Sequence, residues 1–147
     1  MNKVTIIHSN DKRRDEIARS VAEKMDVNYI DIQDYVLRGC VLHGDLDEMS
    51  REEFYERYGS DTYDFLEHLA YTAYTNLKEP FIITIDNPHN QIHIPRLKGT
   101  ISVHVNAEGE PPLFSLIADH VVNDGDDVVD EIIQIITADE RWSNEEK

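Results

Sequence analysis

The sequence predicts an α/β domain built on a five-stranded, mostly parallel sheet with helices on both faces. The chain has 147 residues, which is close to the usual size of one domain. Three β-branched runs, at residues 3–8, 81–85 and 100–105, carry few polar side chains, as expected of strands that are buried on both faces. Segments with apolar residues at helical spacing separate these runs, and this alternation is typical of parallel sheets.

The N-terminal part predicts a strand, a helix and a second strand. After the strand at residues 3–8, a turn at residues 9–11 leads into apolar residues at helical spacing, which predict an amphipathic helix over about residues 12–25. Residues 27–32 alternate and predict the second strand, and the chain is expected to be irregular from Gly39 to Gly44.

The middle of the chain predicts two consecutive helices. Ser50 with Glu53 matches a capping box that opens the first of them. Gly59 interrupts this helix, and Ser60 with Asp61 is expected to cap the second. The core-facing side of that second helix is predicted to consist of Phe65, Leu66, Leu69, Ala70, Ala73 and Leu77.

The C-terminal part adds three strands and a last helix. A third strand at residues 81–85 ends in a turn, and the fourth strand follows at residues 100–105. A fifth, short strand is expected near residues 118–122, and the acidic turn after it caps a helix whose apolar residues begin at Val128. The domain is assigned to residues 1–138, and a polar C-terminal tail to residues 139–147.

Charge and cysteine content exclude several functions. The 14 basic and 30 acidic residues give a net charge of −16, which argues against direct binding to nucleic acid or to an anionic membrane but permits a basic partner. The single cysteine, Cys40, excludes a disulfide framework and a thiolate-rich zinc site. The sequence has neither a long apolar run nor a signal peptide, so the cytoplasm is the expected compartment.

Five segments together resemble a P-loop kinase of the nucleoside-monophosphate and shikimate kinase group. KVTIIH (residues 3–8), a six-residue loop and DEIARSVAEKM (residues 15–25) resemble the first strand, phosphate loop and first helix of that family. YIDIQDYV (residues 29–36) resembles the second strand with its acidic substrate-site residues. FIITID (residues 81–86) resembles the strand that ends in an aspartate, and residues 120–136 resemble the last strand and helix. The resemblance implies a P-loop kinase-like fold.

The phosphate-loop motif of this family is degraded. The pattern G-x-x-x-x-G-K-[ST] falls on residues 8–15, where His8 and Arg13 replace the two glycines. Side chains at these positions obstruct a backbone that must wrap closely around phosphate. Arg14 replaces the lysine, and Asp15 replaces the hydroxyl residue that would ligate magnesium.

The lid of the family is also missing. It would lie between the fourth and fifth strands and would carry arginines that clamp the transferring phosphoryl group. Residues 106–117 contain neither lysine nor arginine. We therefore do not expect ordinary ATP-dependent phosphoryl transfer, and no catalytic residue is assigned.

Several residues remain candidates for an anion or nucleotide site. The basic run from Lys12 to Arg14 lies at a predicted helix N-terminus, where an anion is favoured, although the preferred interpretation is a solvated first turn that balances a very acidic surface. Asp86 could hold magnesium through water or cap a turn. Asp31 and Asp34 correspond to the substrate-side acids of the family or are polar residues at the sheet edge. The full candidate set is Ser9, Asn10, Lys12, Arg13, Arg14, Asp31, Asp34 and Asp86.

The last 42 residues are strongly acidic. Residues 106–147 contain 12 acidic and 2 basic residues, so they contribute −10 of the net −16. Such a run is ordinarily a solvated face, but it can also meet a basic protein groove and speed association electrostatically. The candidate protein-contact residues are Asp124, Asp126, Asp127, Asp130, Glu131 and Trp142.

The function predicted from these features is non-catalytic. A pseudokinase-like binding or regulatory protein would act on a protein partner through its acidic surface, as a phage or mobile-element protein that modulates a host protein would do. One alternative is an atypical nucleotide-binding protein or nucleoside monophosphate kinase, which would need Mg²⁺ and a nucleotide. The other is a structural scaffold subunit that forms a homo-oligomer. The non-catalytic reading predicts no cofactor and no metal site.

Overall fold

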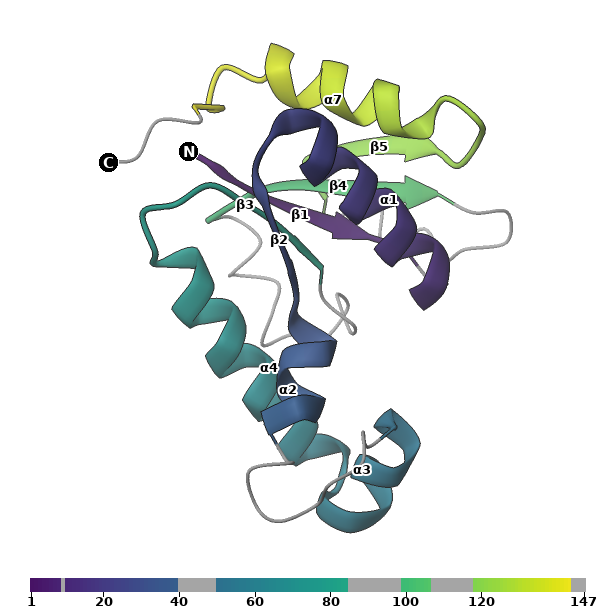
Figure 1. Cartoon of the computed structure of the whole chain (residues 1–147), viewed down its shortest axis with the longest axis vertical. Helices are drawn as coiled ribbons and strands as arrows, with labels where there is room; N and C mark the ends of the chain where they lie inside the picture. Colours follow the sequence, from purple (N-terminus) through teal and green to yellow (C-terminus); the bar gives the residue numbers. More distant parts are fainter. Residues whose placement is uncertain (9, 40–49, 85–98, 107–117, 144–147) are drawn as a thin grey trace.

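A computed structural model describes residues 1–8, 10–39, 50–84, 99–106 and 118–143 (Figure 1). Its centre is a five-stranded sheet in the order β2-β3-β1-β4-β5. All four neighbouring pairs of strands are parallel, so the predicted fold class is confirmed and the sheet is wholly rather than mostly parallel. The strands are β1 (Lys3–Ile7), β2 (Asn28–Asp31), β3 (Phe81–Thr84), β4 (Ile101–Asn106) and β5 (His120–Asn123).

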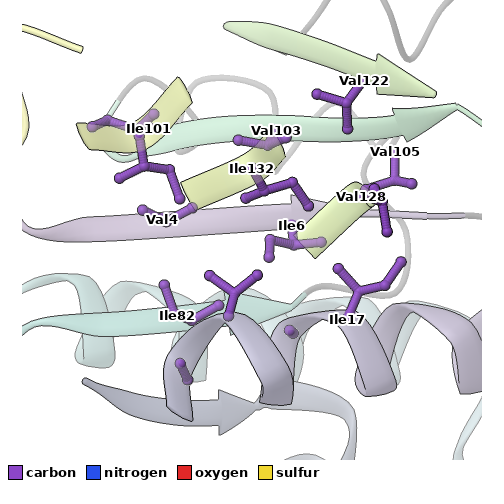
Figure 2. Packing of buried hydrophobic residues seen from close by; sticks show 14 residues of the cluster. Val4, Ile6, Ile17, Ile82, Ile101, Val103, Val105, Val122, Val128 and Ile132 are labelled. Atoms are coloured by element: carbon purple, nitrogen blue, oxygen red, sulfur yellow. The ribbon is translucent and has the colours of Figure 1, made fainter. Parts of the chain in front are cut away.

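Helices cover both faces of this sheet, as predicted (Figure 1). On one face, α1 (Asp11–Met25) and α7 (Val128–Ala138) pack on a cluster that includes Val4, Ile6 and Ile82 (Figure 2). On the other face lie α2 (Ile32–Gly39), α3 (Arg51–Tyr58) and α4 (Ser60–Thr75). Residues alternate between the two clusters along β1 and β3, because successive side chains of a strand point to opposite faces.

The structure corrects the predicted helical regions in two places. Residues 32–39, for which the sequence analysis assigns no helix, form α2 directly after β2. The core-facing side of α4 was also predicted wrongly, since its fully buried side chains include Tyr63, Glu67 and Tyr71. Of the predicted residues, Ala70 is buried and Leu66 packs against the core, whereas Phe65, Leu69, Ala73 and Leu77 are exposed.

Of the two predicted helix caps, the structure confirms the one at Ser50 and corrects the one at Ser60. The Ser50 side chain accepts a hydrogen bond from the Glu53 N–H at 3.1 Å, as the capping box requires. Ser60, by contrast, is the first residue of α4, and the capping position belongs to Gly59, which has a φ of 88°. A backbone in that region favours glycine, so Gly59 ends α3 and turns the chain into α4.

Residues 139–143, which the sequence analysis places in a polar tail, pack on the domain. Trp142 packs against the core cluster that includes residues of α1 and α7, and the Ser143 N–H donates to the Met1 carbonyl at 2.7 Å. Asp139 accepts hydrogen bonds from the His120 Nε2 at 2.8 Å and from the Arg141 guanidinium at 2.7 Å. Among the described helices, none is both long and apolar enough to cross a membrane.

Candidate functional site

The candidate residues gather at the carboxyl edge of the sheet, where ligands bind in open parallel α/β folds. β1 ends at Ile7 and α1 begins at Asp11, so three residues connect them. The six-residue loop that the family resemblance implies is therefore wrong, whereas the helix predicted from about residue 12 already includes Arg13 and Arg14, which lie in the first turn of α1. This connection is short because the helix extends upstream to its N-cap residue, Asn10.

An internal carboxylate holds the basic side chains at the start of α1. Asp124, which directly follows β5, accepts hydrogen bonds from Arg13 Nη2 at 2.8 Å and from Arg13 Nε at 3.1 Å. The same carboxylate lies 2.9 Å from His8 Nε2. The Asp124 side chain is 20% exposed and that of Arg13 is 38% exposed. The Arg13 guanidinium, and to a lesser degree His8, hold the pKa of Asp124 below its ordinary value.

Local hydrogen bonds orient the His8 ring. The Asn10 N–H donates to His8 Nδ1 at 2.9 Å, so this ring nitrogen is an acceptor. The proton is thereby assigned to Nε2, which donates to Asp124. The Asn10 side chain in turn accepts from the Arg13 N–H at 2.9 Å. The Arg13 N–H, which could otherwise bind an anion at this helix N-terminus, therefore already has an acceptor within the protein.

Arg14 points to the other side of α1 and is completely buried. Its guanidinium contacts Asp15 Oδ1 at 3.1 Å and Gln33 Oε1 at 3.4 Å. The Tyr29 hydroxyl also donates to Asp15, at 3.2 Å. A buried guanidinium is strongly destabilising unless it is paired, so this cluster fixes Arg14 inside the domain. The predicted alternative of a solvated first turn is thus wrong for Arg14, although Lys12 is exposed.

Two acids at the junction of β2 and α2 lie near this cluster. Asp31 is the last residue of β2 and Asp34 lies in the first turn of α2. Asp31 accepts a hydrogen bond from the Asp34 N–H at 3.1 Å, which starts the helix. Burial raises the pKa of Asp31, and the nearby Asp15 carboxylate adds to the increase.

The remaining candidates form two groups. Asp126, Asp127, Asp130 and Glu131 are exposed in the turn before α7 and in its first turn, and Asp130 also contacts Lys24 at 3.2 Å. Trp142, by contrast, is half-buried against the core. Ser9 and Asp86 lie outside the described residues. No three histidine, cysteine or acidic side chains converge as a metal site in the described part of the chain.

Sequence reasoning missed three members of this site. His8 was identified as the replacement of the first motif glycine but was not in the candidate set, and neither Tyr29 nor Gln33 was chosen as a candidate. Asp124 was expected to face a partner protein, but most of its carboxylate is used internally. The missing signal is the strand order: because β4 and β5 extend the sheet beyond β1, the residues that follow β1 and β5 meet at one edge.

Solved structures show the same architecture. A shikimate kinase from Acinetobacter baumannii, in complex with shikimate, matches with a TM-score of 0.77 at 13% sequence identity, over 97% of this chain and 96% of that chain. The chain has a P-loop kinase-like fold. The shikimate kinases of Aquifex aeolicus and Bacteroides thetaiotaomicron match with TM-scores of 0.72 and 0.69, each at 12% identity, over 92% of this chain and 96% of theirs.

No family model and no curated protein matches the sequence. At 12–13% identity the structural likeness concerns the fold alone. One fold supports many functions, so the activity of this chain has to be argued from its own residues at the carboxyl edge.

Proposed function

We propose that the chain is a non-catalytic, pseudokinase-like binding protein in which the carboxylate of Asp124 blocks the phosphate site. The observation that carries the proposal is the contact of Asp124 with Arg13 and His8. A carboxylate takes the place of a ligand's anionic group beside the N-terminus of α1. Binding a polyphosphate there would require breaking these bonds and bringing more negative charge next to Asp124 and Asp15.

The local backbone supports the same reading. The sequence lacks both glycines of the phosphate-loop motif, and only three residues join β1 to α1. A phosphate loop needs a longer stretch of backbone N–H groups that surround the anion. Arg14, at the position of the motif's lysine, is buried against Asp15 and Gln33 rather than directed at a ligand. The absence of basic residues at 106–117 removes the lid arginines as well.

A partner is proposed to bind at the acidic turn before α7. Asp126, Asp127, Asp130 and Glu131 are exposed there, and of these only Asp130 has a basic contact among the described ion pairs. A protein with a basic surface fits this charge, and electrostatic attraction would speed its association. Such a role fits a phage or mobile-element protein that modulates a host protein.

Nucleotide binding is tested by thermal unfolding with ATP, GTP and deoxynucleoside monophosphates at millimolar concentrations, with and without magnesium. A ligand at a hundredfold its Kd stabilises a fold by roughly 2.7 kcal/mol, which corresponds to several degrees. The proposal predicts no shift, with an authentic P-loop kinase measured alongside as the positive control. A magnesium-dependent shift that Arg13→Ala and Arg14→Ala remove would overturn it and favour the alternative of an atypical nucleotide-binding protein.

The partner is tested by affinity capture with two matched variants. Neutralising the acids of the α7 turn, as D126N/D127N/D130N/E131Q, should abolish capture of a basic protein, and the captured amount should fall as salt rises. Neutralising three exposed acids of α3, as E52Q/E53Q/E56Q, removes a comparable charge elsewhere and should leave capture intact. Equal losses in both variants would mean that net charge, rather than this surface, attracts the protein.

A further inference from the structure

The outer face of α4 is uncharged and exposed to solvent. Phe65 and Leu69 are 56% and 48% exposed, and they lie one helical turn apart on the side opposite the buried Tyr63, Glu67 and Tyr71. The exposed positions on this outer face are Thr62, Phe65, Leu69, Ala73 and Asn76. None of them is charged, in a chain of which 30% of the residues are charged.

This composition differs from that of the other exposed helices. α3 presents Glu52, Glu53, Glu56 and Arg57 to solvent, and the first turn of α7 is acidic. Depletion of charge together with an aromatic side chain is the compositional mark of an interface core. In Figure 1, α4 also runs along an outer edge of the molecule, away from α1 and α7.

We infer that this face of α4 is where a second copy of the chain binds, through two antiparallel α4 helices related by a two-fold axis at Leu69. The spacing of the residues makes the face self-complementary. With Leu69 opposite its own counterpart, Phe65 of each copy meets Ala73 of the other, so that a large side chain packs against a small one. α4 has 16 residues, which gives a contact about 24 Å long.

Charge complementarity favours a second copy in this orientation. The N-terminal end of α4 carries the exposed Asp61, and the turn after its C-terminal end carries the exposed Lys78 beside Glu79, whose charge acts on the buried Lys3. An antiparallel pair brings the Asp61 end of each helix to the Lys78 end of the other, and it also opposes the two helix dipoles. The acidic turn before α7 lies on the opposite face of the sheet, so its repulsion is far from this contact. The inference is independent of the proposed absence of nucleotide binding.

The test is analytical ultracentrifugation of the full chain from micromolar to sub-millimolar concentration at physiological ionic strength. Wild type should show a monomer–dimer equilibrium. Leu69→Lys should weaken the dimer at least about a hundredfold, because the two-fold axis puts the substituted residues opposite each other. Because the added lysine makes the chain less negative, the loss cannot come from stronger repulsion between the net negative charges of the two copies. Val121→Lys, at an apolar residue on β5 that is 44% exposed, is the matched control and should leave the dimer unchanged.

A mixture of Leu69→Lys and Leu69→Glu should form a heterodimer, since opposite charges then meet at the axis. Should Leu69→Lys lower the thermal midpoint of the monomer, Ala73→Lys on the same exposed face replaces it. A wild-type chain that stays monomeric over the whole range overturns the inference, even if another protein binds to α4. A dimer that neither Leu69→Lys nor Ala73→Lys weakens overturns it as well, because the contact then lies elsewhere.

Discussion

The Asp124 contact makes a measurable prediction about stability. Asp124→Ala removes the acceptor of the Arg13 guanidinium and of His8 Nε2. The His8 side chain is only 2% exposed, so its N–H would be left without an acceptor, at a cost of about 1–3 kcal/mol. Arg13 is 38% exposed, and solvent screening limits its share to about 0–1 kcal/mol. The expected total is about 1–4 kcal/mol.

Urea unfolding at neutral pH measures this loss, and two variants separate its parts. Asp124→Asn keeps an oxygen acceptor but removes the charge, so its loss should be smaller than that of Asp124→Ala. Asp126→Ala changes an exposed acid of the same turn and should cost less than about 0.5 kcal/mol. The reasoning is refuted if Asp124→Ala and Asp126→Ala are equally stable, since the carboxylate would then hold nothing in place.

The pH dependence gives a second check on the same contact. Arg13 lowers the pKa of Asp124 in the folded chain below the unfolded value of about 3.9. The stabilisation that it contributes is therefore fully present above the unfolded pKa and is lost as the pH falls through the folded pKa. The stability difference between wild type and Asp124→Ala should stay constant from neutral pH to about pH 5 and shrink below it. A difference that persists unchanged in acid would show that the ionised carboxylate is not its source.

Two further substitutions test the reading of the fold. Asp139→Asn should cost about 2 kcal/mol in urea unfolding, because Arg141 and His120 hydrogen bond to a carboxylate that is 8% exposed. Arg141 holds the pKa of Asp139 well below its ordinary range, so this cost too should disappear on acidification, and a cost unchanged in acid would contradict the assignment. Gly59→Ala should cost about 1–3 kcal/mol from its backbone conformation alone, since no atom lies within 4 Å of an added Cβ. Gly125→Ala, which is equally open but lacks a positive φ, should cost almost nothing, and equal effects of the two alanines would disprove the strain argument.

The order of strands and helices could be predicted from the sequence because most elements carry their own local signal. β1, β3 and β4 are β-branched runs buried along nearly their whole length, and α1 has apolar residues at helical spacing. α2 was missed, because Ile32 and Val36 are its only fully buried apolar residues and they read equally well as the end of β2. Its first turn forms on the Asp31 side chain, a contact that periodicity does not detect.

The buried face of α4 could not be predicted because it depends on partners distant in the sequence. Two apolar arcs run along this helix, and the one rich in phenylalanine and leucine looked more suitable for the core. The buried arc instead contains Tyr71, whose hydroxyl lies 2.6 Å from the Thr5 hydroxyl on β1 and 3.3 Å from that of Thr100. A tyrosine can be buried at low cost only where such partners exist. No local pattern shows that two threonines will lie beneath it.

The candidate site was predictable to a similar extent. The basic run was correctly placed at the start of a helix. The sequence did not show, however, that Arg13 would pair with Asp124 while Arg14 is buried against Asp15 and Gln33. Arg13 and Arg14 are adjacent, so a helix directs them about 100° apart, one toward β5 and one toward β2. Arg14 contacts its own neighbour in α1, Asp15, whereas the contact of Arg13 with Asp124 depends on the strand order, because Asp124 follows β5.

The two proposals together have a consequence that neither has alone. The sheet separates the uncharged face of α4 from the acidic turn before α7, so a dimer formed through α4 would present two acidic turns to solvent. A partner with two basic sites could then bind both, and avidity would exceed the affinity of one turn without any new contact. Leu69→Lys, far from the acids, should therefore weaken binding of such a partner while leaving the affinity of each turn unchanged. Surface plasmon resonance in both orientations separates these quantities, and an equal effect of Leu69→Lys on monovalent and bivalent binding would show that α4 touches the partner directly.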